Sequence, residues 1–147
     1  SIDKIDLPNN DLFVYCVDIP EIGEILIAEN GNILLNNLTF HHSLLIKTPD
    51  EVIINSGDND ELYIDTKNVI ILNEIDCPTK IKSLLIKSND TGSKLYIPQK
   101  NVLIIDKLIS QNILIMNFGS LIINDSNILN DCSIINNGQI RTEKIEN

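Results

Sequence analysis

Short apolar triplets recur along this chain at a nearly constant interval. They form two alternating series, and most steps within a series are about 19 residues long, as in a repeat protein. The triplets of the first series begin at Ile25, Leu44, Leu62, a degenerate position near Cys77, Leu95, Ile113 and Ile134. The triplets of the second series begin at Ile33, Val52, Val69, Leu84, Val102, Leu121 and Ile140. A steady period indicates one structural unit that is repeated along the chain.

Some of the repeated segments are near copies of one another. Residues 43–48 have the sequence SLLIKT and residues 83–88 have the sequence SLLIKS. Short strands with turn residues between them would also suit an antiparallel β-sandwich, which is the alternative fold. A sandwich does not predict two alternating series of triplets or such near copies in distant parts of the chain. The repeat therefore favours a β-solenoid.

Composition agrees with short strands and tight corners. The 147 residues include 29 Ile, 18 Leu and 20 Asn but a single Ala, so residues that favour strands and turns prevail over helix formers. In a solenoid each circuit adds a strand to a parallel sheet, and corners such as Asn30-Gly31 and Asn137-Gly138 join the strands. We expect circuits of about 19 residues, with room for a third short strand at pieces such as Leu38-Thr39-Phe40.

The run from Phe118 to Gly138 is punctuated by Asn and Gly between apolar triplets. This pattern resembles the repeats of right-handed parallel β-helix proteins, a superfamily that includes adhesins, viral fibre or tailspike domains and polysaccharide lyases. The resemblance covers roughly residues 23–141. It implies an all-β, right-handed parallel β-helix (β-solenoid) and carries over no functional residue. We expect an N-terminal segment or cap at residues 1–22 and a solenoid domain at residues 23–147.

Alternation along each strand predicts which side chains face the core. In residues 32–36, placing Ile33 and Leu35 inside leaves the flanking asparagines outside, whereas the opposite register buries both asparagines. The same choice suits residues 51–55, 83–87 and 120–124. One register therefore serves most strands.

That register turns the middle residue of each triplet outward. Neighbouring strands lie about 4.8 Å apart, so such residues would form a long apolar stripe, and large exposed apolar patches usually mark an interface. We predict an interface formed by Leu34, Ile53, Ile70, Leu85, Leu103 and Ile122, with Leu26, Leu45, Tyr63, Tyr96 and Leu114 on an adjoining face. The predicted cover is an identical subunit, a neighbouring domain of the same protein or the segment 1–22.

Charge and hydropathy exclude several partners. The formal net charge of −10 opposes binding to nucleic acid and to anionic membranes. No apolar run approaches the roughly 20 residues of a membrane-spanning helix, so we expect no membrane insertion. The cysteines Cys16, Cys77 and Cys132 lie far apart and are expected to act as ordinary small apolar residues.

We find no motif for catalysis and predict no catalytic, cofactor or metal residue. The adjacent His41 and His42 should point to opposite faces of a strand, which does not suit a shared metal. An acidic cluster of Asp58, Asp60 and Glu61, with Asp65 nearby, offers carboxylates for calcium but lacks the glycine and final glutamate of an EF-hand loop. Asp58, Asp60 and Asp65 are the carboxylates to test if the chain cleaves polysaccharides, with Asp58→Asn and Asp60→Asn as the substitutions.

These observations lead to three hypotheses. The first is a non-catalytic structural or adhesive β-helix module of a cell-surface, virion or fibre protein, which assembles through its apolar outer face. The second is a carbohydrate-binding or polysaccharide-cleaving domain of the same architecture, with a glycan as its partner. The third is an intracellular scaffold that binds a different protein. The first hypothesis favours an extracellular, cell-surface or virion location over the cytoplasm.

Overall fold

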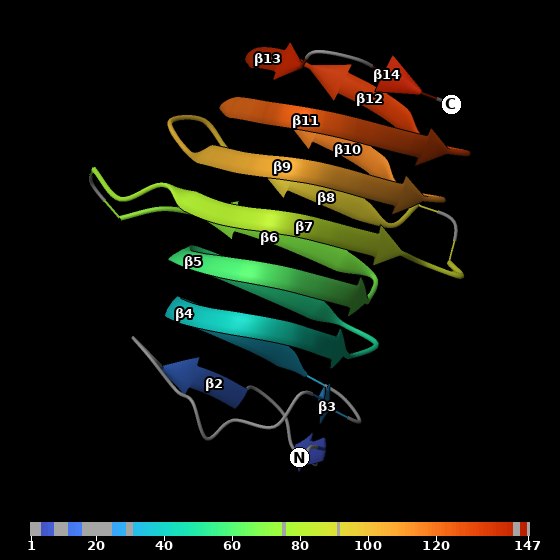
Figure 1. The fold of residues 1–147 in the computed structure, drawn as a ribbon. Helices are drawn as coiled ribbons and strands as arrows, with labels where there is room; N and C mark the ends of the chain where they lie inside the picture. The colour runs from blue at the N-terminus through green and yellow to red at the C-terminus, as the bar shows by residue number, and fades with distance from the viewer. Residues whose placement is uncertain are drawn as a thin grey trace.

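The chain winds as a coil of parallel strands. The computed structural model describes residues 4–7, 12–15, 25–28, 31–74, 76–90, 92–142 and 145–146. The strands at the front of Figure 1 run to the right, those behind run to the left, and the chain climbs from the N-terminus to the C-terminus, so the coil is right-handed. Every described strand ladder is parallel, and the isolated bridge between Glu74 and Cys77 is antiparallel. The predicted β-solenoid is confirmed and the antiparallel sandwich is wrong.

The described residues contain fourteen strands of one sheet. Their bounds are β1 Lys4–Leu7, β2 Leu12–Tyr15, β3 Ile25–Ala28, β4 Asn32–Lys47, β5 Glu51–Asp65, β6 Asn68–Leu72 and β7 Thr79–Lys87. The chain continues with β8 Lys94–Ile97, β9 Val102–Gln111, β10 Leu114–Asn117, β11 Ser120–Asn130, β12 Ser133–Asn136, β13 Gln139–Thr142 and β14 Ile145–Glu146.

Strand pairing divides the coil into three faces, which we name A, B and C in chain order. Face A contains β2, residues 32–36 of β4, residues 51–55 of β5, β6, β8, β10 and β12. Face B contains residues 38–40 of β4, 57–59 of β5, 79–81 of β7, 102–105 of β9, 120–123 of β11, and β13. Face C contains β1, β3, residues 43–47, 61–65, 83–87, 107–111 and 126–130 of the same long strands, and β14. Residues 38–40 therefore do form the predicted third strand of their circuit.

Two of the long strands cross all three faces because they bend at each corner. Asn37 and Ser56 stand at the same corner, between faces A and B, and both have a φ of 55°. Short polar residues adopt this left-handed conformation more readily than branched ones. At the corner between faces B and C, the register shifts between Phe40 and Ser43, which is a β-bulge. The corners thus bend the strand while the ladders on each side stay in register.

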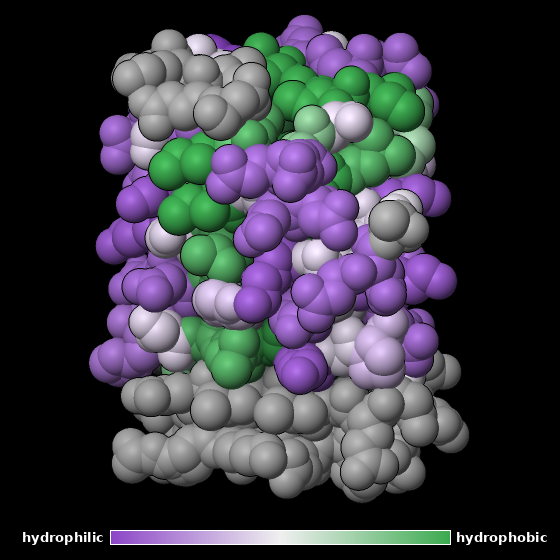
Figure 2. Space-filling model, turned by 90° about the vertical axis from the view of Figure 1, so that its right-hand side faces the viewer, coloured by the Kyte–Doolittle hydropathy of each residue, from purple (hydrophilic) through white to green (hydrophobic). Residues whose placement is uncertain are grey.

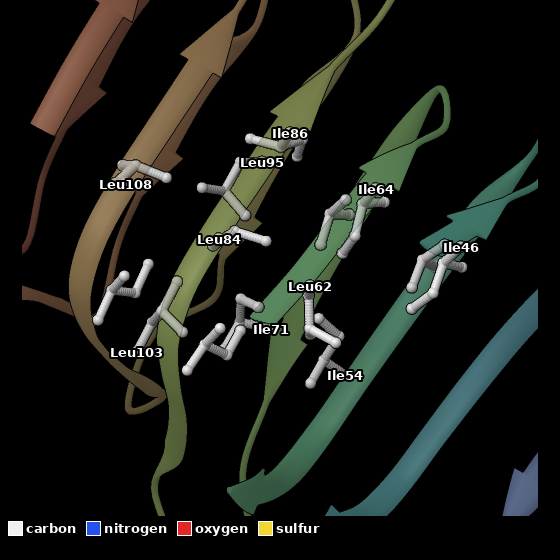
Figure 3. Close-up of a cluster of buried hydrophobic side chains, with 14 of the residues drawn as sticks. Ile46, Ile54, Leu62, Ile64, Ile71, Leu84, Ile86, Leu95, Leu103 and Leu108 are labelled. Carbon is white, nitrogen blue, oxygen red and sulfur yellow. The ribbon is translucent and has the colours of Figure 1, made fainter. Parts of the chain in front are cut away.

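Inward side chains from the three faces fill a narrow apolar core. Figure 3 shows Ile54, Leu62, Ile71, Leu84 and Leu103 reaching into this space from neighbouring strands. The predicted register is confirmed for four rungs, whose inward residues are all buried: Ile33, Leu35, Val52, Ile54, Leu84, Ile86, Leu121 and Ile123. Burial of this apolar surface is the main source of stability in such a fold.

Leu103 was predicted to face outward, and the structure corrects this. Its side chain is 0% exposed, and its neighbour Ile104 takes the outward position instead. The strand has four apolar residues between Asn101 and Asp106, so the two polar flanks lie on opposite faces in either register. Pairing with Thr79 on one side and Leu121 on the other decides the matter, because both are inward and buried.

The two predicted series also change faces in the middle of the chain. The first series moves from face C to face A, whereas the second moves from face A to face C at Leu84 and to face B from Val102 onward. Successive rungs of face A begin at positions 32, 51, 68, 94, 114 and 133, so the circuit that starts at Asn68 is clearly longer than the others. The long circuit contains the corner between β6 and β7, where the sequence pattern suggested a degenerate strand near Cys77. As a result Leu62, from the first series, pairs with Leu84, from the second.

Thr79 closes this irregular corner from inside. Its hydroxyl donates to the Leu72 carbonyl at 2.9 Å and accepts hydrogen bonds from the Ser56 amide at 3.0 Å and the Asn73 side chain at 2.7 Å. The Asn73 side chain in turn accepts from the Val102 amide. Buried polar groups must be paired in this way, and here they connect successive circuits.

The N-terminal and C-terminal ends of the coil are the rungs that have a neighbour on one side. Within the predicted segment 1–22, β1 and β2 pair in parallel with β3 and β4. The remaining residues of that segment, Cys16 among them, lie outside the described residues, and its capping role stays a prediction. At the other end Ile134 stands at a core-facing position but is 40% exposed, whereas Ile115, one rung below, is 0% exposed.

Candidate interaction surface

Face A carries an unbroken ladder of apolar side chains on its outer side. Six residues pair rung by rung along it: Leu34, Ile53, Ile70, Tyr96, Met116 and Ile135. The first five are partly exposed and Ile135, on the last rung, is 45% exposed. At the usual strand spacing the ladder is about 24 Å long. We call this set the face A ladder.

The residues predicted as one interface are divided among the three faces. Leu34, Ile53, Ile70 and Tyr96 belong to the face A ladder, and Leu114 lies on the same face in the neighbouring column. Leu45, Tyr63 and Leu85 pair in order on face C, and Ile122 lies on face B. Leu103 is in the core, and the side chain of Leu26 is outside the described part. The role of the outward residues as an interface stays a prediction.

Three residues that the sequence pattern missed complete the surface of face A. Met116 and Ile135 continue the ladder, and Phe118 packs edge-on against Tyr96 with ring centroids 5.7 Å apart. Period-2 counting from Leu114 would have placed Met116 and Phe118 on the same side as Leu114. With Glu51, Asn68, Ile70 and Lys94, these rings border a shallow depression.

Face C has a second apolar ladder, but charged columns flank it. Its outward residues pair in the order Leu45, Tyr63, Leu85, Ile109 and Ile128. One flanking column runs Lys47, Asp65, Lys87, and the other includes Glu61 and Lys107. Figure 2 looks onto the end of the molecule where the face C strands finish. A band of hydrophilic residues lies in the middle of this view, with hydrophobic residues to its left and at the upper right. Face C is therefore more polar than face A.

Lys87 and Tyr63 form a charged contact on face C. The Lys87 ammonium lies 5.5 Å from the centre of the Tyr63 ring. A hydrogen bond to Tyr63, followed by charge interactions with Tyr63 and Asp65, raises the pKa of Lys87 above its ordinary value of 10.5, although desolvation opposes this. Because the folded pKa is the higher one, the ammonium form of Lys87 persists to a higher pH in the folded chain than in the unfolded chain.

Tyr63→Phe is expected to return the pKa of Lys87 toward 10.5, because the substitution removes the hydroxyl and keeps the ring. NMR titration of the lysine side-chain carbons measures the change directly. Tyr96→Phe is the matched control, since Tyr96 lies on face A and should leave the titration of Lys87 unchanged. An unchanged Lys87 pKa in Tyr63→Phe would show that the hydroxyl has no part in the shift.

The acidic residues considered for calcium or catalysis are not brought together. Asp58 faces outward on face B, whereas Glu61 and Asp65 lie on face C. Asp60, at the corner between them, lies 3.4 Å from the Lys82 ammonium and 3.6 Å from Nδ1 of His41. Within the described ranges, no three His, Cys, Asp or Glu side chains are grouped so that they could hold a metal ion.

The histidines and the described cysteines differ in their surroundings. His41 and His42 are both exposed at the bulge, so they do not alternate between the two sides of the strand as predicted. The bulge inserts an extra residue there, and this breaks the alternation. Cys77 and Cys132 are free and partly buried, and the Cys132 thiol lies 3.2 Å from the carbonyl oxygen of Ser110.

No protein-family model, curated protein or solved structure matches this chain. In the part of the chain that the structure describes, no helix has the length and hydropathy needed to cross a membrane.

Proposed function

We propose that this protein is a non-catalytic structural or adhesive β-solenoid module of a cell-surface, virion or fibre protein, and that it assembles with a second copy through face A. One observation carries the proposal. The face A ladder continues over six rungs without a charged residue in it, in a protein of net charge −10. Contiguous apolar surface of this kind usually marks an interface.

The size of face A sets the expected strength of assembly. A ladder about 24 Å long on strands about 16 Å wide has a projected area of roughly 400 Å². Standard stable interfaces bury about 800 Å² on each partner, so this one belongs with the smaller and weaker class. We therefore expect the dimer to have a dissociation constant in the micromolar range. Measurements at about 10 to 200 µM protein should then cover both the monomer and the dimer.

Sedimentation equilibrium of the chain tests the proposal. The unchanged protein should sediment as a dimer at the upper end of that range, and Ile70→Asp should shift it to a monomer, because the substitution places a charge in the middle of the face A ladder. Ile104→Asp on face B is the matched control and should still sediment as a dimer. Leu85→Asp, measured in the same way, shows whether face C contributes to the dimer, because dissociation of this variant would place face C in the interface. A monomer at every concentration would refute assembly through face A.

The depression beside Tyr96 supports glycan binding as a second candidate function. Two aromatic rings lie there next to a carboxylate, an amide and an ammonium group, from Glu51, Asn68 and Lys94. Such a mixture of apolar and polar groups is typical of sites for small ligands. Glycan array binding that Tyr96→Ala abolishes, by a protein that sediments as a monomer, would favour this candidate over assembly.

A further inference from the structure

Two charged residues stand in the face A strands from β4 to β12, and they have opposite signs. Glu51 and Lys94 lie in one outward column beside the face A ladder, in the order Asn32, Glu51, Asn68, Lys94, Leu114, Ser133. Asn68 separates them, so the two charges are about 10 Å apart along the column at the usual strand spacing. This distance is too long for a direct ion pair within one chain.

A second copy on face A would remove water from both charges. Burying an unpaired carboxylate or ammonium group is costly, so a stable arrangement must give each one an opposite charge. Like copies usually associate about a twofold axis, which leaves two simple choices for face-to-face packing. A twofold axis parallel to the long axis of the coil places each rung opposite the same rung of the second copy. Glu51 then lies opposite Asn55 of the second copy, so neither Glu51 nor Lys94 meets an opposite charge.

A twofold axis parallel to the strands makes the rungs of the second copy run in the opposite order to those of the first. Placed at Ile70, it brings Glu51 of each copy opposite Lys94 of the other, and Ile53 opposite Tyr96. Ile70 then packs against its own counterpart. On this ground, and resting on the proposed assembly through face A, we propose that the dimer is antiparallel, with two Glu51–Lys94 pairs related by the twofold axis.

Charges at the corners do not decide between the two arrangements. Lys67, Glu74 and Asp76 border the rung of Ile70, and the antiparallel axis would bring each near its own counterpart at the rim. All three are exposed, so water and salt screen them. The pairs inside the face are the ones that lose their water, and they therefore set the orientation.

Charge reversal gives a test that only the antiparallel arrangement passes. Glu51→Lys alone and Lys94→Glu alone each create two repulsive pairs, so each variant should dissociate at least about tenfold more readily than the unchanged protein. An equimolar mixture should form a dimer with one copy of each variant, because both pairs then have opposite signs. Sedimentation equilibrium measures the masses, and native mass spectrometry with one variant isotope-labelled identifies the mixed dimer.

Controls and outcomes separate this inference from the proposed function. Glu61→Lys and Lys107→Glu make the same reversals on face C and should leave the dimer unchanged. If the unchanged protein is a monomer, assembly through face A fails, and the orientation fails with it. If the unchanged protein is a dimer but the mixture of Glu51→Lys and Lys94→Glu stays monomeric, assembly stands and the antiparallel orientation is wrong.

Discussion

Leu103→Asp is expected to abolish the folded state. The Leu103 side chain is 0% exposed and pairs with the buried Thr79 and Leu121 in the inward ladder of face B. Losing a buried leucine costs about 2 to 5 kcal/mol, and an unpaired buried carboxylate adds several more. Domains of this size are stable by only about 5 to 15 kcal/mol. Circular dichroism and a urea titration should therefore show loss of the cooperative unfolding transition.

Ile104→Asp is the control on the same strand. Ile104 is partly exposed on the outer side of face B, where it pairs with Lys80 and Ile122. An aspartate there reaches water and has a lysine beside it, so the unfolding free energy should change by less than about 1 kcal/mol. A folded Leu103→Asp together with an unfolded Ile104→Asp would mean that the register of β9 is one residue off.

Gly57→Ala is expected to destabilise the coil by more than about 4 kcal/mol, an exceptional value for a single methyl group. Gly57 has a φ of 117°, a conformation that side chains disfavour. A Cβ atom at this position would lie 2.4 Å from the Leu38 carbonyl oxygen and 3.0 Å from its amide nitrogen. Those atoms are backbone of the adjacent rung, so relief requires the two rungs to separate.

Gly92→Ala distinguishes the steric effect from the conformational one. Gly92 also has a positive φ, of 86°, but nothing lies within 4 Å of the position of its Cβ. This variant should lose about 1 to 2 kcal/mol, which is the cost of a left-handed residue alone. Urea unfolding of both variants measures the two costs. Equal losses in Gly57→Ala and Gly92→Ala would mean that the close approach to Leu38 is not maintained in solution.

Gly57 also shows what a local pattern can and cannot give. The pair Ser56-Gly57 is recognisable as a corner from residue type alone, because turns favour these residues. The contact between Gly57 and the Leu38 backbone is not recognisable, because it joins residues in successive circuits. The same limit applies to Thr79, which resembles an ordinary strand threonine until the Ser56 amide and Asn73 side chain are brought to it.

The candidate surface was predictable in kind but not in composition. Alternation correctly indicated that residues such as Leu34, Ile53 and Ile70 face outward. It could not show that Tyr96 follows Ile70 on face A while Leu85 follows Tyr63 on face C. The predicted stripe and its adjoining face are therefore divided among faces A, B and C, and the columns beside the ladder carry fewer charged residues on face A than on face C.

The sequence by itself determined the parallel coil, its period of about 19 residues and the inward or outward direction of most strand residues. The direction of each side chain follows from alternation between adjacent residues, and the coil follows from a pattern that recurs in the sequence itself. The tertiary structure decided which face each triplet joins and which way Leu103 points. Those depend on hydrogen bonds between successive rungs, which are distant in the sequence. The corner between β6 and β7 changes the spacing of the rungs without altering the pattern of apolar residues on either side.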